Sequence, residues 1–231
     1  MSTFETRKGS HISEQFDHDL RLVSSHMMEM GGLVEEQVAS AINALINVDA
    51  EAARQVIERD VIINRMETSV DNECTNIIAR RQPAASDLRL VISISKAVAD
   101  LERIGDEAKR IAKMAVSLSE GGGTTQGFVE VRHIGQMVRH MVHESLDAFV
   151  RMDTEDAAAL ATRDIEVDRE YASAMREMMT YMMEDPRMIS RAMNVIWALR
   201  SLERIGDHAL NIAEQVVYTV SGKDVRHAPL A

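Results

Sequence analysis

The chain has 231 residues, enough for one domain or two small ones. Apolar residues make up 45% of it and aromatic residues only 3%, with little proline, a composition that favours helix. The net charge of −11 argues against nucleic-acid binding, because an acidic surface repels phosphate backbones. No stretch reaches the ~20 apolar residues that cross a bilayer, so no direct membrane insertion is expected. The single cysteine, Cys74, fits a reducing, cytoplasmic location.

Three helices are expected in the first half. Residues 1–13 are polar and predict a flexible N-terminus. From Glu14 onward apolar residues recur every three or four positions, which predicts one long helix. Asp49 is a suitable N-cap for a second helix that ends near Arg81. Pro83 then marks the start of a third helix up to about residue 119.

The second half is expected to repeat this plan. A glycine-rich linker over residues 120–127 precedes it. Asp153 repeats the capping role of Asp49, and Asp185-Pro186 predicts the start of the last helix. The predicted fold is all-α, with six long helices forming two similar three-helix bundles over residues 14–119 and 128–220, followed by a C-terminal tail over residues 221–231.

An internal repeat supports this duplication. The sequence LERIGD occurs at residues 101–106 and again at 202–207, a separation of 101 positions. The first two helices of each half align at a separation of 104, as Asp49 and Asp153 do. Self-similarity over this length indicates a duplicated architecture.

The repeat carries paired acidic side chains that predict metal sites. Residues four apart on a helix face the same way, and the second helix of each half supplies another pair at this spacing. Clustered oxygen donors suit hard cations, so we expect a divalent or ferric ion (Fe, Mn, Mg or Zn). The candidate ligands are Asp60, Asn64, Glu102 and Asp106 in the first half and Asp164, Asp168, Glu203 and Asp207 in the second.

The two clusters differ in their neighbouring charges. Lys109 and Arg110 follow the first LERIGD, whereas Leu210 and Asn211 stand at the matching positions of the second. Asn64 also gives the first cluster one carboxylate fewer. The better metal site is therefore expected in the second half. Salt bridges and solvated acidic faces are the alternative explanation for such pairs.

These features together resemble the PhoU family of phosphate-transport accessory proteins. The resemblance rests on two three-helix units, each with an acidic pair before a proline-containing turn and LERIGDxAxxIA after it. It implies a cytoplasmic homodimer, peripheral at the inner membrane through its partners, that negatively regulates the phosphate-starvation response. It also implies coupling of a phosphate ABC transporter, through its ATPase subunit, to a sensor histidine kinase. Finally, it implies metal binding through the paired carboxylates named above.

No motif predicts an enzyme. The sequence contains no Walker-type nucleotide loop and no local signature of Ser/His/Asp or Cys/His catalysis. The leading hypothesis is a non-enzymatic regulator. The alternatives are a metal-dependent or iron-handling helical-bundle enzyme and a purely structural helical scaffold.

Overall fold

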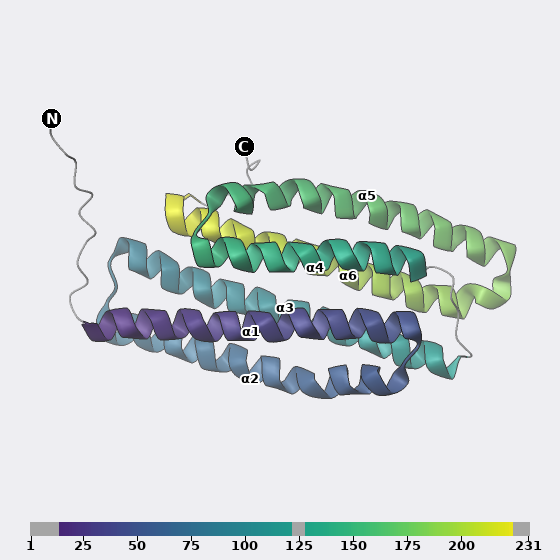
Figure 1. Ribbon diagram of the computed structural model, residues 1–231, viewed down its shortest axis with the longest axis horizontal. Helices are drawn as coiled ribbons and strands as arrows, with labels where there is room; N and C mark the ends of the chain where they lie inside the picture. The colour runs from purple at the N-terminus through teal and green to yellow at the C-terminus, as the bar shows by residue number, and fades with distance from the viewer. Residues whose placement is uncertain (1–13, 122–127, 224–231) are drawn as a thin grey trace.

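The structure is a computed structural model that describes residues 14–121 and 128–223. Six long helices account for nearly all of these residues, which confirms the predicted all-α fold of two similar three-helix bundles (Figure 1). The predicted flexible N-terminus over residues 1–13, most of the predicted linker and the end of the predicted tail lie outside the described residues. The helices are α1 (Glu14–Asn47), α2 (Ala50–Arg81), α3 (Ala85–Glu120), α4 (Phe128–Arg151), α5 (Thr154–Glu184) and α6 (Ile189–Ser221).

The predicted helix caps are confirmed at equivalent positions of both halves. The Asp49 carboxylate accepts hydrogen bonds from the backbone N–H groups of Glu51 and Ala52, each at 3.0 Å, and Asp153 does the same for α5. One boundary differs from the prediction. Asp185 caps a single 3₁₀ turn (Pro186–Met188), and α6 begins only at Ile189, so the proline lies in that turn and not in the first turn of α6.

Helices α3 and α6 form the centre of the molecule. They run antiparallel, since Ser93 near the start of α3 meets Gln215 near the end of α6, and Ser117 meets Asn194. Helices α1 and α2 pack on α3, while α4 and α5 pack on α6. Helices α1 and α4 also pack against each other, in front of the α3–α6 layer in Figure 1. One apolar core with residues from all six helices therefore joins the halves.

Two glycines at matching positions allow α1 and α4 to approach closely. A Cβ added at Gly31 would lie 2.9 Å from the side chain of Leu146, and one added at Gly135 would lie 3.1 Å from Ile42. Each glycine thus receives an aliphatic side chain from the opposite half. In the described part of the chain, none of the helices combines the length and apolarity that crossing a bilayer requires.

Candidate metal centres

The N-terminal cluster is neutralised by a lysine. Asp60 on α2 is 1% exposed, and the ammonium of Lys109 on α3 lies 2.7 Å from its Oδ2. Gln37 on α1 donates from Nε2 to Asp60 Oδ1 and to the backbone oxygen of Gly105, at 3.2 Å each. Asp106 is also within reach of Lys109, at 3.8 Å. The ammonium group thus supplies a positive charge to both aspartates.

The charges of this cluster act on one another. The hydrogen bond to Asp60 raises the pKa of Lys109, and the charges of Asp60, Asp106 and Glu102 raise it further. Loss of hydration raises the pKa of Glu102, and repulsion from Asp106 adds to this. Lys109 therefore forms ion pairs with two carboxylates, Asp60 and Asp106, as salt bridging would require.

The C-terminal cluster has no equivalent of Gln37 and Lys109, the two side chains that donate hydrogen bonds to Asp60. Asp164 on α5 holds the position equivalent to Asp60, but the repeat replaces Gln37 by Met141 and Lys109 by Leu210. The packing confirms this replacement, since a Cβ added at Gly206 would lie 3.7 Å from both Asp164 Oδ1 and Met141 Sδ. An apolar thioether and an apolar leucine therefore stand where the first half has an amide and an ammonium.

Repulsion in this cluster is strong. Burial raises the pKa of Asp164 to about 6, and the charges of Asp207, Asp168 and Glu203 contribute to this rise. Loss of hydration, followed by repulsion from a neighbouring aspartate, also raises the pKa values of Glu203 and Asp207. Arg200 pairs with Glu203 Oε1, but the buried Glu203 Oε2 has no hydrogen-bond partner. Among the described residues, Arg200 forms the ion pair to these four carboxylates, and His208, Arg200 and Arg204 lower the pKa of Asp207 from a greater distance.

The predicted carboxylates are brought together on α2 and α3 in the first half and on α5 and α6 in the second. Asn64 Oδ1 is buried without a hydrogen-bond partner, and Asp168 and Asp207 lie at the exposed edge of their cluster. As the side chains stand, no group of three or more His, Cys, Asp or Glu residues in the described ranges could hold a metal ion. The orphaned oxygen of Glu203 and the all-oxygen donor set nevertheless have the chemistry that hard cations prefer.

Sequence reasoning missed Gln37 and the partner of Lys109. Gln37 is a buried polar residue in the apolar stripe of α1. In the sequence, only its alignment with the apolar Met141 of the second repeat indicates that it faces the core. The sequence places Lys109 one turn after Asp106, on the same helix. Its closer partner is Asp60, which depends on how α2 lies against α3, and no local spacing reveals that register.

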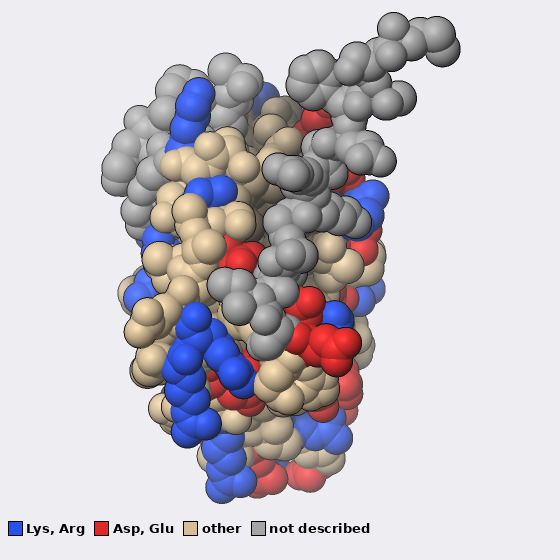
Figure 2. Space-filling model, turned by 90° about the vertical axis from the view of Figure 1, so that its left-hand side faces the viewer, with Lys and Arg blue, Asp and Glu red and all other residues tan. Residues whose placement is uncertain are grey.

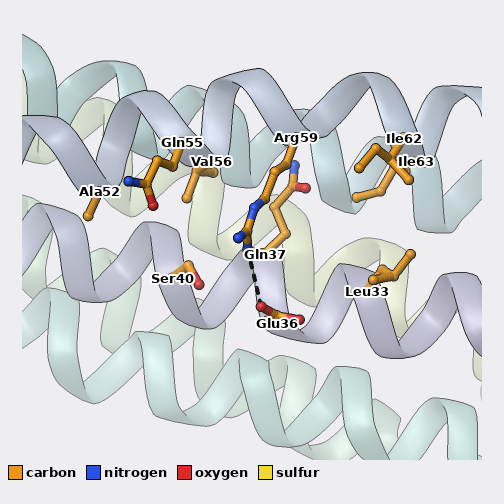
Figure 3. Close-up of a pocket in the computed structure, with 10 residues that line it drawn as sticks. All are labelled: Leu33, Glu36, Gln37, Ser40, Ala52, Gln55, Val56, Arg59, Ile62 and Ile63. Atoms are coloured by element: carbon orange, nitrogen blue, oxygen red, sulfur yellow. Dashed lines mark hydrogen bonds and ion pairs between the residues drawn. The ribbon is translucent and has the colours of Figure 1, made fainter.

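A small cavity lies beside the N-terminal cluster, between α1 and α2 (Figure 3). It measures about 140 Å³, and Arg59 reaches across it from α2 to Glu36 on α1, at 3.3 Å. Its wall includes the aliphatic side chains of Leu33 and Ile62. In the second half, His140 stands at the position of Glu36 and Glu166 at the position of Ile62. The lining of this cavity therefore also differs in polarity between the repeats.

Comparisons with known proteins agree with the repeat. The PhoU domain model matches the chain twice, over residues 27–115 and 131–216. The phosphate-specific transport system accessory protein PhoU homolog of Pseudomonas aeruginosa is 62% identical over 95% of this chain and 91% of its own length. The accessory protein PhoU of Escherichia coli is 45% identical over 94% of this chain and 90% of its own length.

Solved structures give the same result. The crystal structure of PhoU from Pseudomonas aeruginosa matches with a TM-score of 0.88 and 61% identity, covering 90% of this chain and all of that one. The phosphate transport system regulatory protein PhoU from Streptococcus pneumoniae matches with a TM-score of 0.85 and 31% identity, over 91% of this chain and 99% of that one. With two matched domains and relatives of this identity along nearly its full length, the chain belongs to the PhoU family.

Proposed function

We propose that this chain is a non-enzymatic accessory protein of phosphate-specific transport that represses the phosphate-starvation response. It would act in the cytoplasm, between the ATPase subunit of a phosphate ABC transporter and a sensor histidine kinase, and would reach the membrane only through such partners. The observation that carries the proposal is the match to phosphate-transport accessory proteins at up to 62% identity across both repeats. The lack of a catalytic constellation in the sequence supports a binding role over an enzymatic one.

A reporter strain tests this function. Deleting the gene should switch on a reporter of phosphate-starvation genes in high-phosphate medium, because the repressing contact is gone. Expression of the chain from a plasmid should silence the reporter again. A reporter that stays silent in the deletion strain at high phosphate would refute the regulatory role.

We further propose that the C-terminal cluster, and not the N-terminal one, binds a divalent or ferric ion. Asp164, Glu203 and Asp207 would supply oxygen ligands, and the ion would relieve the repulsion that raises their pKa values. In the N-terminal cluster Lys109 already supplies the positive charge. The bound ion would join α5 to α6 and so stiffen the second bundle.

Metal analysis separates the two clusters. Protein purified without chelator should lose most of its bound metal in a Glu203→Ala, Asp207→Ala variant, as measured by inductively coupled plasma mass spectrometry. The equivalent Glu102→Ala, Asp106→Ala variant is the matched control and should keep the metal content of the wild type. Equal metal content in all three proteins would exclude the C-terminal site.

A further inference from the structure

Among the described helices, none covers one side of the central α3–α6 layer. Helices α1 and α4 cover the other side, where they also contact each other. Within the described ranges, α2 and α5 make no contact with one another, although each packs on one helix of the layer. A strip of α3 and α6 between them therefore faces solvent, as the exposed side chains of Arg103, Arg110 and Arg200 confirm.

This strip contains a groove that combines an exposed tryptophan with arginines. Trp197 is the only tryptophan in the chain, and 56% of its surface is exposed. Beside it is a cavity of about 290 Å³. We call this the Trp197 groove; it is lined by Glu107, Arg110 and Met114 from α3 and by Trp197, Arg200, Ser201 and Arg204 from α6. Exposed tryptophan and arginine side chains are the residues most enriched at energetic centres of protein interfaces.

A buried carboxylate fixes two of these arginines. Glu107 is 2% exposed, and its Oε1 accepts hydrogen bonds from Arg110 Nη1 at 2.7 Å and pairs with Arg204 Nη1 at 2.9 Å. The two guanidinium groups come from opposite halves of the chain and are held at one point. Each has further N–H groups that can donate to another acceptor. Arginines held in place beforehand lose less entropy when a partner binds.

The matching half of the strip is arranged differently. The repeat places Lys96 where the groove has Trp197 and Arg103 where it has Arg204. Lys96 lies over the ring of Tyr218, 5.3 Å from its centre. Asp100, on the same face, pairs with His208 at 2.9 Å and accepts from Asn211 at 3.1 Å. Contacts between α3 and α6 thus satisfy the polar groups here, and no large apolar side chain replaces Trp197.

The charge of the groove contrasts with that of the whole molecule. The chain has a net charge of −11, yet its basic side chains are not evenly spread. Figure 2 looks onto the end at which α1 begins and α6 ends, where Lys and Arg side chains are concentrated on the left of the view. Three arginines line the groove; Arg110 and Arg204 share the carboxylate of Glu107, and Arg200 pairs with Glu203. An acidic ligand is therefore attracted to this part of an otherwise acidic protein.

We propose that the Trp197 groove is a docking site for a segment of a partner protein. The segment would place an apolar side chain against Trp197 and Met114, and carboxylates against Arg110 and Arg204. A concave groove between two helices can receive the side chains of a protein segment. A flat bilayer surface would instead contact a convex surface of the protein. The inference rests on the proposed function, because it assigns this surface to one of the two protein partners named there.

A charge substitution with a matched control tests the site. Trp197→Glu removes the apolar anchor and repels an acidic segment, while Lys96→Glu introduces the same acidic side chain at the equivalent position of the other repeat. Biolayer interferometry would measure binding of the full chain to the purified ATPase subunit and to the cytoplasmic part of the kinase. For one partner, Trp197→Glu should weaken binding about tenfold or more, and Lys96→Glu should change it by less than about twofold. Thermal unfolding would confirm that both variants fold.

The outcomes are distinguishable. If the wild type binds a partner and Trp197→Glu binds it equally well, the groove is not the docking site, but the regulatory function stands. If the wild type binds neither protein, both proposals fail. In parallel, binding to vesicles containing phosphatidylglycerol is measured, and analytical ultracentrifugation measures self-association. Loss of vesicle binding or of self-association in Trp197→Glu, with unchanged partner affinity, would assign the groove to a membrane or to a second copy and overturn the proposal.

Discussion

Replacing Lys109 by leucine should lower the free energy of unfolding by about 3 kcal/mol, because it leaves the buried carboxylate of Asp60 without its cation. Asp60 is 1% exposed, and Lys109 approaches it to 2.7 Å. The substitution copies Leu210 of the second repeat, so the new side chain suits a helix at this position. Urea denaturation in the presence of a chelator would measure the change, since a bound cation could otherwise replace the ammonium.

Two further variants make this prediction specific. Lys113→Leu removes an exposed lysine one turn further along α3 and should change the free energy of unfolding by less than about 0.5 kcal/mol. Adding Asp60→Asn to Lys109→Leu should restore part of the lost stability, because a neutral amide can still accept the hydrogen bond from Gln37. If Lys109→Leu and Lys113→Leu were equally stable, the lysine would not neutralise the cluster.

Much of the fold is readable from the sequence because its signals are local. The spacing of apolar residues predicts each helix. Asp49 and Asp153 are the predicted N-caps, and α2 and α5 each begin at the next residue, as expected for a cap. The repeat then predicts that three helices are used twice. The exception is the start of α6, where a local cap and proline, Asp185-Pro186, produce a 3₁₀ turn before the helix.

The contents of the candidate site depend on contacts between helices, which spacing does not reveal. The sequence predicts which carboxylates share a helix face, such as Glu203 and Asp207, and identifies Lys109 as a difference between the repeats. It does not show that Gln37 and Lys109 converge on Asp60 from two other helices. The pairing of Arg204 with Glu107 across the two halves is also absent from any local pattern. These contacts follow from the packing of α1, α2 and α6 on α3.

The substitution Asp164→Asn should stabilise the metal-free protein at neutral pH. The pKa of Asp164 is raised from an unfolded value of 3.8 to about 6 in the folded protein. Between these values the folded state binds more protons than the unfolded state, so stability falls as pH rises from about 4 to about 6. Above this window the wild type has the full repulsion, and the asparagine variant does not. After allowance for solvent screening of a half-buried group, the gain at pH 7.5 is about 1 to 2 kcal/mol.

The pH dependence identifies the cause of this gain. In chelator, urea denaturation at pH 7.5 should favour Asp164→Asn over the wild type, while at pH 3.5 the two should be equal within error, because the wild-type carboxyl is then neutral in the folded state. Glu166→Gln, which neutralises an exposed carboxylate on the same helix, should show little change at either pH. A gain of the same size at both pH values would mean that packing, and not charge, distinguishes the variant.

Adding the metal should reverse the order of the two stabilities at pH 7.5, so that the wild type is more stable than Asp164→Asn, because a cation bound by Asp164 stabilises only the wild type. That reversal would show that the repulsion in the second repeat is maintained for a ligand, whereas Lys109 removes it in the first.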